Sequence, residues 1–335
     1  MSSAVQQLSG SAFISDLGPG ERSAWRFVFT VVLGFVAFVI AAVVGIALSF
    51  ALLIALAGWP APISGPAFQA LLHRFLELTT SDGRSFGEAL QLLAVAIPDN
   101  ILPIFAVIGV ALLIHQRPLR AFITSARRFR WRLLLSGLVF SIIIIGPFLA
   151  LTQMLDPKAE PPPLVTVSPN AGLCALYAAI CIGAFLPAAF GEEMLFRGWL
   201  LRETSAVTRN PIVLVVANGV IFAAAHFQFA PDAFLERAIM GAAFAYMTLR
   251  LGGIEFSTGA HLANNLLIVL FLEPLTLNQP PSEPLSAGAL GQDAYLLAAY
   301  IVMTELTVRW PALRRWAGAD QAMAPPANAA AAHFS

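Results

Sequence analysis

The chain has 335 residues, of which 58% are hydrophobic and 11% are charged, and its mean hydropathy is +0.78. This composition excludes a water-soluble globule, because too few polar side chains are present to cover its surface. The 19 basic and 19 acidic residues cancel, so no basic excess attracts nucleic acid, and two cysteines cannot form a disulfide framework. The sequence therefore predicts an all-α, polytopic protein in contact with the lipid bilayer, with no nucleic-acid partner.

Apolar runs that could span a membrane occur about eight times along the chain, since a spanning helix needs roughly 20 residues. The predicted spans are 27–57, 88–114, 132–154, 172–202, 211–228, 233–250, 255–273 and 291–309. The second is the least regular, because Pro98, Asp99, Asn100 and Pro103 predict either a kink or a re-entrant segment. Between the first two runs, apolar residues at helical spacing over 68–76 predict a helix along the membrane interface.

The distribution of basic residues predicts the orientation of this bundle. With the N-terminus inside, all but four of the 19 Lys and Arg residues fall on the cytoplasmic side, where short loops retain them. The exceptions are Arg74, Arg84, Lys158 and Arg237. We therefore expect a multi-pass protein of a bacterial plasma membrane with both termini in the cytoplasm. The expected organisation is a cytoplasmic segment at 1–26, a bundle at 27–309 and a disordered cytoplasmic tail at 310–335.

Ionisable side chains inside a span are costly, so each calls for a partner or a role. Glu192 and Glu193 continue the fourth span, and Arg197 follows one turn after Glu193. That spacing predicts an ion pair between Glu193 and Arg197, with Glu192 rotated about 100° away from it. Taken alone, the cluster is more typical of a charged helix end at the membrane interface.

Two further polar clusters lie in the fifth and seventh spans. Phe222 and His226 are four residues apart, as are His261 and Asn265, so each pair shares a helix face. Each cluster alone is also typical of interior packing or of hydrogen bonds between helices. Glu192 and His226 lie equally far from the turn between their helices, so a hairpin would place them at similar depth. We expect Glu192, His226, His261 and Asn265 to meet in one cavity in the cytoplasmic half of the bundle.

The three clusters form an ordered set of motifs. They are Glu192-Glu193-x-x-x-Arg197, Phe222-x-x-x-His226 and His261-x-x-x-Asn265, each on an apolar span. Together they resemble the motifs of the CAAX-protease and bacteriocin-processing family (CPBP, or Abi), which includes prenyl-protein endopeptidases. The resemblance covers about residues 172–273. One departure is Glu255, where a small or neutral residue is expected, and we interpret this side chain as solvated.

The resemblance implies an intramembrane endopeptidase of the glutamic type, a hydrolase with no metal and no other cofactor. It implies that Glu192 is the general base and that His226 helps to hold the attacking water. It further implies that His261 and Asn265 stabilise the oxyanion. A carboxylate in a cavity of low dielectric constant is suited to this task, because desolvation makes it a better proton acceptor.

The same resemblance implies supporting roles and a class of substrate. Glu193 and Arg197 would be structural, and Phe222 would line the cavity. The implied partner is a peptide or a membrane-protein substrate, with a prenylated CAAX protein as one option.

The same residues leave three other functions to consider. The two histidines and the glutamates could bind zinc in a membrane protease, although the pattern His-Glu-x-x-His is absent and Asn265 is a poor zinc ligand. A non-catalytic immunity or scaffold protein would keep the polar clusters for packing alone. A transporter is disfavoured because no internal repeat is visible. The combination of Glu192, His226, His261 and Asn265 favours an enzyme.

Overall fold

The computed structural model describes residues 7–15, 17–18, 21–57, 65–157, 159–167, 170–278 and 285–323. Over these ranges the chain is helical, and its only β pairing consists of two isolated bridges, Asp82 with Thr276 and Thr124 with Gly253. The predicted all-α class is confirmed. An apolar chain in lipid satisfies its backbone hydrogen bonds within helices, which explains why so little else is present.

Each predicted span corresponds to a helix. The first four are α3 (Ala24–Ala57), α5 (Phe86–His115), α6 (Trp131–Leu155) and α8 (Ala171–Glu193), which continues through a π-helix, η2 (Met194–Leu200), into α9 (Leu201–Val207). The others are α10 (Pro211–Ala224), α11 (Pro231–Leu251), α12 (Glu255–Leu267) with the π-helix η3 (Ile268–Leu272), and α13 (Ala287–Arg309). Shorter elements are α2 (Ala12–Ser15), α4 (Gly65–Leu78), η1 (Leu119–Phe122), α7 (Pro163–Thr166), α14 (Pro311–Ala317) and η4 (Ala319–Met323). The helix α4 matches the predicted interfacial segment.

When helices are selected by length and composition alone, fewer than the expected eight qualify as membrane spans. Four stretches qualify, namely α3, α5, α6 and the continuous run from α8 to α9. A fifth qualifies if α13 and α14, which are bent by 90° at their junction, count as one span. The apolar helix α10 has 14 residues, which is too short. The helices α11 and α12 carry ionisable residues along their length, so hydropathy does not select them.

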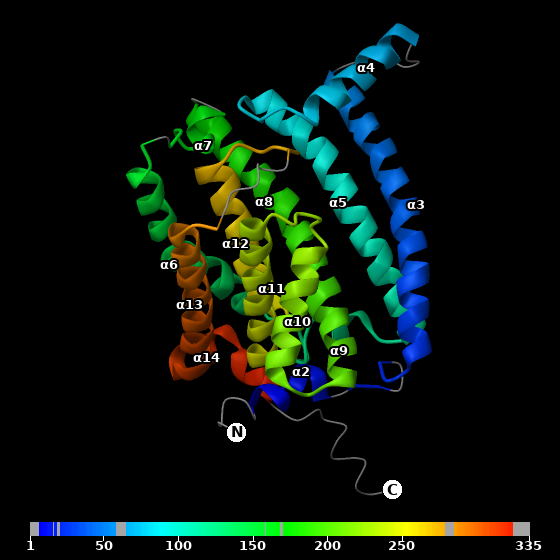
Figure 1. Ribbon diagram of the computed structural model, residues 1–335, viewed down its shortest axis with the longest axis vertical. Coiled ribbons are helices and arrows are strands. Elements are labelled where there is room, and N and C mark those ends of the chain that lie inside the picture. Colours follow the sequence, from blue (N-terminus) through cyan, green and yellow to red (C-terminus); the bar gives the residue numbers. More distant parts are fainter. Residues whose placement is uncertain are drawn as a thin grey trace, which may run out of the picture.

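The helix α5 settles how the second predicted span is built. Its 30 residues run as one helix through Pro98 and Pro103, with no re-entrant turn. Ser85 caps its first turn, where the hydroxyl oxygen accepts a hydrogen bond from the backbone N–H of Glu88. The helix packs mainly against α3, and this pair forms one side of the molecule (Figure 1).

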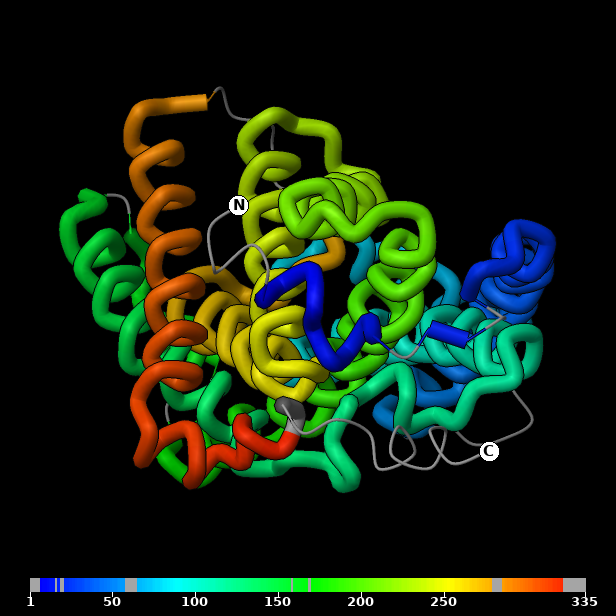
Figure 2. Tube along the Cα trace, turned by 90° about the horizontal axis from the view of Figure 1, so that it is seen from below, coloured from blue at the N-terminus to red at the C-terminus, as the bar shows by residue number. Residues whose placement is uncertain are grey.

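The helix α12 lies at the centre of the bundle, in contact with α6, α8 and α11. Twelve of its 13 residues are buried. It approaches α6 closely because both helices have glycine at the crossing: a Cβ at Gly259 would collide with the carbonyl oxygen of Leu134, and one at Gly137 with that of Phe256. Small residues at a crossing allow such contact between membrane helices. Viewed from below, α3 and α13 lie on opposite sides of this centre (Figure 2).

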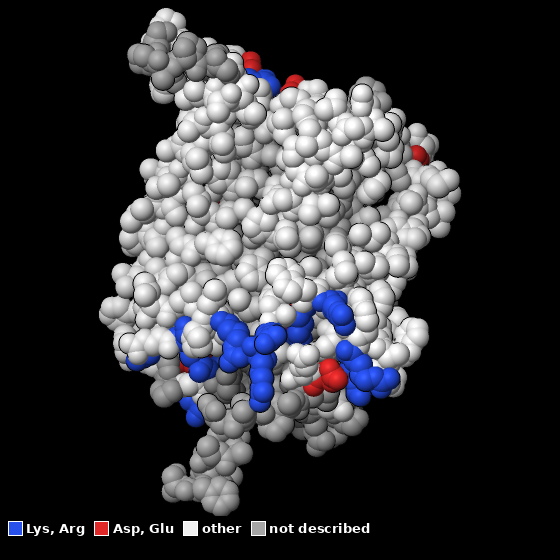
Figure 3. Space-filling model, turned by 180° about the vertical axis from the view of Figure 1, so that it is seen from behind, with Lys and Arg blue, Asp and Glu red and all other residues white. Residues whose placement is uncertain are grey.

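Basic side chains gather at one end of the molecule, which we call the basic end. Figure 3 shows Lys and Arg side chains in a band there, below a largely uncharged surface. The turns η1, α9–α10 and α11–α12 lie at this end (Figure 1), as the loop charges predict. Ordered structure also continues past residue 309, since α14 and η4 lie within the predicted tail, whereas residues 324–335 lie outside the described residues.

The expectation that Glu255 is solvated is wrong. Its side chain is fully buried and pairs with Arg130 through two contacts, at 2.9 Å from Nε and at 2.7 Å from Nη2. Arg130 also donates to the carbonyl oxygen of Leu251 at 2.8 Å. A buried carboxylate requires such a partner, and this one fastens the connection before α6 to the turn between α11 and α12.

Candidate active site

The first motif lies where α8 passes into the π-helix η2. Glu193 and Arg197 are both fully buried and form the predicted ion pair at 3.0 Å. Arg197 also donates to the carbonyl oxygen of Gly241 at 2.9 Å, and its guanidinium lies 4.4 Å from the ring centroid of Phe222. Single π-helical turns are frequent at functional sites. Here the turn is supported by Asn218 of α10, whose amide donates to the carbonyl oxygen of Phe196 at 2.8 Å.

His261 of α12 lies between the two glutamates. Its Nδ1 is 3.0 Å from Oε1 of Glu193, and its Nε2 is 3.7 Å from Oε2 of Glu192. The Glu193 carboxylate accepts, so Nδ1 of His261 carries a proton. Sequence spacing predicted the partner of Glu193 within its own helix but missed this contact with His261, 68 positions along the chain.

His226 lies just past the end of α10, in the turn that leads to α11. Its Nδ1 is 2.8 Å from the carbonyl oxygen of Phe222, which can only accept, so this nitrogen also carries a proton. In the neutral ring Nε2 is then an acceptor. The next residue, Phe227, has a φ of 54°, an uncommon backbone conformation for a residue other than glycine. Such outliers occur often at functional sites.

Phe222 does not line the cavity as expected. It is fully buried, with its ring 4.6 Å from the ring of His226 and 6.0 Å from that of His261. It therefore packs behind both histidines. Asn218 and Phe222 of α10, and His226 just past its end, are spaced four residues apart, so this spacing is the sequence signal that could have indicated the buried Asn218.

The four expected catalytic residues line one cavity of about 300 Å³. They are Glu192, His226, His261 and Asn265. We call it the inner cavity. Apolar walls come from Phe185, Ile268 and Val269, and residues 273–276 line one side. Among the described residues, no group of three or more His, Cys, Asp or Glu side chains is arranged to hold a metal ion.

The inner cavity extends toward the end of the molecule opposite the basic end. Residues 273–276 follow η3, at the end of α12 farthest from the basic end. Gly83, in the connection between α4 and α5, donates its N–H to the carbonyl oxygen of Leu275 at 2.7 Å. The inner cavity thus borders the connections that the loop charges place outside. The equal spacing of Glu192 and His226 from the turn between their helices fixes their relative depth but gives no direction of opening.

Comparison with known proteins supports the motifs. Residues 174–267 match the family described as type II CAAX prenyl endopeptidase Rce1-like. Over 186 residues the chain is 30% identical to the uncharacterized protein YyaK of Bacillus subtilis (strain 168), an alignment that covers 52% of this chain and 60% of that relative. No solved structure matches the chain. Glu192, His226, His261 and Asn265 all lie inside the segment that resembles the Rce1-like type II CAAX prenyl endopeptidases.

Proposed function

We propose that the protein is an intramembrane endopeptidase that hydrolyses a peptide bond with a water molecule activated by Glu192. The observation that carries this proposal is the convergence of Glu192, His226, His261 and Asn265 on one cavity. These residues come from three different segments of the chain, and packing alone gives no reason for all four polar side chains to face the same space.

The chemistry follows from the donors and acceptors around the cavity. Glu192 takes a proton from water, and the oxygen of that water attacks the carbonyl carbon of the peptide bond. His226, with its Nδ1 proton held by the Phe222 carbonyl, presents Nε2 as an acceptor that orients the water. When the carbon–nitrogen bond breaks, Glu192 returns the proton to the leaving amine.

The developing negative charge on the carbonyl oxygen needs donors. The amide of Asn265 donates in any protonation state of the site, and His261 donates from Nε2 when both of its ring nitrogens carry protons. Glu193 accepts from Nδ1 of His261 and so fixes the plane of that ring. Glu193 is then a positioning residue, held in turn by Arg197.

The substrate is a peptide or a membrane protein, and prenylation of it is one option that the family match suggests. We further propose a location in a bacterial plasma membrane with both termini in the cytoplasm. The band of basic side chains supports that orientation. The similarity to a Bacillus protein supports the bacterial setting.

The test is peptide cleavage by purified protein in detergent, with cut sites identified by mass spectrometry. Glu192→Gln keeps the shape of the side chain but removes the base, and the rate should fall by about 10²- to 10⁴-fold. Glu77→Gln, an exposed carboxylate on α4, is the matched control and should cleave normally. Near-normal turnover by Glu192→Gln would refute the assignment of the base.

A zinc-dependent protease is the competing mechanism, and the same preparations separate the two. Elemental analysis should accompany the assay, because a tightly bound ion resists chelators. Stoichiometric zinc that is lost together with activity in His226→Ala would favour the zinc mechanism. A wild-type protein that cleaves no peptide or membrane-protein substrate would favour the immunity or scaffold alternative.

A further inference from the structure

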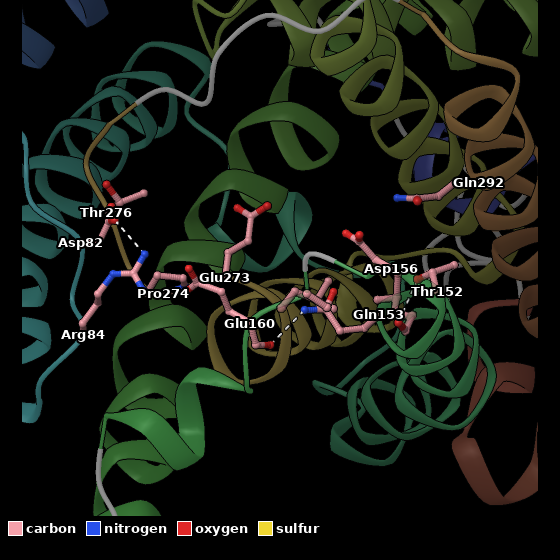
Figure 4. Close-up of a pocket in the computed structure, with 13 residues that line it drawn as sticks. Asp82, Arg84, Thr152, Gln153, Asp156, Glu160, Glu273, Pro274, Thr276 and Gln292 are labelled. Atoms are coloured by element: carbon pink, nitrogen blue, oxygen red, sulfur yellow. Dashed lines mark hydrogen bonds and ion pairs between the residues drawn. The ribbon is translucent and has the colours of Figure 1, made fainter.

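A second, larger cavity of about 430 Å³ lies at the end of the molecule opposite the basic end, and we call it the outer cavity. Three connections build it. Asp82 and Arg84 come from the connection before α5, Thr152 lies near the end of α6 with Asp156 and Glu160 in the connection after it, and Glu273, Pro274 and Thr276 follow η3 (Figure 4). Most of the labelled side chains in Figure 4 are polar, in contrast to the largely uncharged surface over the middle of the molecule (Figure 3).

The outer cavity and the inner cavity share a wall. Glu273, Pro274 and Thr276 line both of them. A peptide that lies in the outer cavity therefore needs to pass only this short segment to reach Glu192. No part of the mechanism proposed above uses the outer cavity.

The backbone of the shared wall is suited to hold an extended peptide. Asp82 and Thr276 form an antiparallel bridge, in which Gly83 donates its N–H to the carbonyl oxygen of Leu275. In a trans peptide unit the N–H is opposite the C=O, and successive units alternate along an extended strand. The carbonyl of Pro274 and the N–H of Thr276 are thus directed away from Gly83. They offer an acceptor and a donor to a further strand, which is how many extended peptides bind.

The charge of the outer cavity indicates what the peptide carries. Its described lining contains four carboxylates, from Asp82, Asp156, Glu160 and Glu273, and one base, Arg84. Arg84 already lies between two of the acids, 2.6 Å from Glu160 and 3.5 Å from Asp82. The lining therefore keeps an excess of negative charge, and a cationic segment complements it.

We propose that the outer cavity is a substrate subsite that binds an extended, Lys- or Arg-containing segment of the peptide, pairing with residues 274–276, while the scissile bond lies in the inner cavity. This inference rests on the proposed protease function and names its substrate class. It also gives a direction, because the basic segment approaches from the face opposite the basic end. A substrate confined to the side of the basic band would not reach this cavity.

The experiment is a cleavage-site profile on a library of synthetic peptides with randomised positions, read by mass spectrometry. Wild-type protein should select Lys or Arg at fixed positions on one side of the cut bond, by about fivefold over a neutral residue. This preference should weaken with added salt, since partly exposed charges are screened. In Asp156→Asn combined with Glu160→Gln, two acids that line the outer cavity but not the inner one, the preference should fall toward background, while neutral peptides are still cut at the wild-type rate. Glu77→Gln on α4 should retain the full preference.

The outcomes separate the two proposals. Cleavage without a basic preference, or an equal preference in the double variant, would overturn the subsite while leaving the protease intact. Loss of neutral-peptide cleavage in the double variant would also overturn it, because the two acids would then act in catalysis or folding. Failure of the wild-type protein to cut any peptide, with Glu192→Gln indistinguishable from it, would refute the protease function and the subsite with it.

Discussion

The helices α3 and α12 are opposites in composition and in position. The helix α3 is the most apolar stretch of the chain, yet only 11% of its most apolar window is buried inside the protein. The helix α12 contains Glu255, His261 and two asparagines, yet almost all of it is buried. In a bilayer, strong hydropathy marks the surface that faces lipid, whereas polar residues mark the protein interior. The polar residues of the site therefore lower the hydropathy of α12, whereas the run from α8 to α9, which carries Glu192, still qualifies as a span.

The largest expected effect on the free energy of unfolding comes from the buried charges around α12. Glu193→Gln leaves the buried Arg197 without its carboxylate, and the free energy of unfolding should fall by about 3–5 kcal/mol. Glu192→Gln should unfold like the wild type, because Glu192 makes no ion pair shorter than its 3.7 Å contact with His261. Denaturant titration in mixed micelles measures both.

Measuring peptide cleavage by the same two variants sharpens this prediction. Glu193→Gln should lose activity together with stability, since Glu193 also orients His261, whereas Glu192→Gln should lose activity alone. If Glu193→Gln abolished cleavage while the fold remained as stable as the wild type, Glu193 and not Glu192 would be the better candidate for the base.

These charges also show how far the sequence can predict the structure. Each apolar run became a helix, because run length and breakers act locally. The meeting of Glu192 and His226 in one cavity was predictable because their helices share a turn. The pairing of Arg130 with Glu255, 125 positions apart, and the wall at 273–276 were not predictable. Both depend on how connections pack across the ends of the bundle, for which a single sequence contains no local signal.

The next largest expected effect on stability concerns the packing of a glycine at a helix crossing. A Cβ at Gly259 of α12 would collide with the Leu134 carbonyl, so Gly259→Ala should force α6 and α12 apart and cost about 1–3 kcal/mol. Gly109→Ala on α5 is the control, because nothing lies within 4 Å of its added Cβ. There alanine should be neutral or stabilise the helix by up to about 1 kcal/mol. Equal losses of stability in both variants would mean that the close crossing of α6 and α12 does not require glycine at residue 259.

A smaller effect, dependent on pH, is expected at the basic end. Glu21 is buried and accepts from Arg117 at 2.8 Å and from Arg202 at 3.1 Å. Burial raises the pKa of Glu21, but the charge of Arg202 and the hydrogen bond from Arg117 outweigh it, so the pKa lies below its ordinary value of 4.5. The stabilisation is therefore fully present above the unfolded pKa and is lost as the pH falls through the lower, folded value.

The midpoint of thermal unfolding, followed from about pH 6 to pH 3, measures this contribution. The difference between wild type and Glu21→Gln should be largest at the upper end and should shrink toward the lower end. The comparison variant Glu77→Gln should follow the wild-type curve. A difference that stayed constant over the whole range would show that Glu21 contributes by packing and not through its charge.

The smallest expected effect on stability is the difference between a lipid-facing and a protein-facing isoleucine. Ile145 of α6 is fully buried, whereas Ile40 of α3 is 60% exposed. Ile145→Val removes a methyl group from a packed interior and should cost about 0.5–1.5 kcal/mol. Ile40→Val exchanges one lipid contact for another and should stay within about 0.5 kcal/mol of the wild type. Both variants keep the β-branched shape, so helix propensity and rotamer restriction change little, and the difference isolates burial. A loss at Ile40 as large as that at Ile145, measured in the same micelles, would mean that α3 packs against another protein surface and not against lipid.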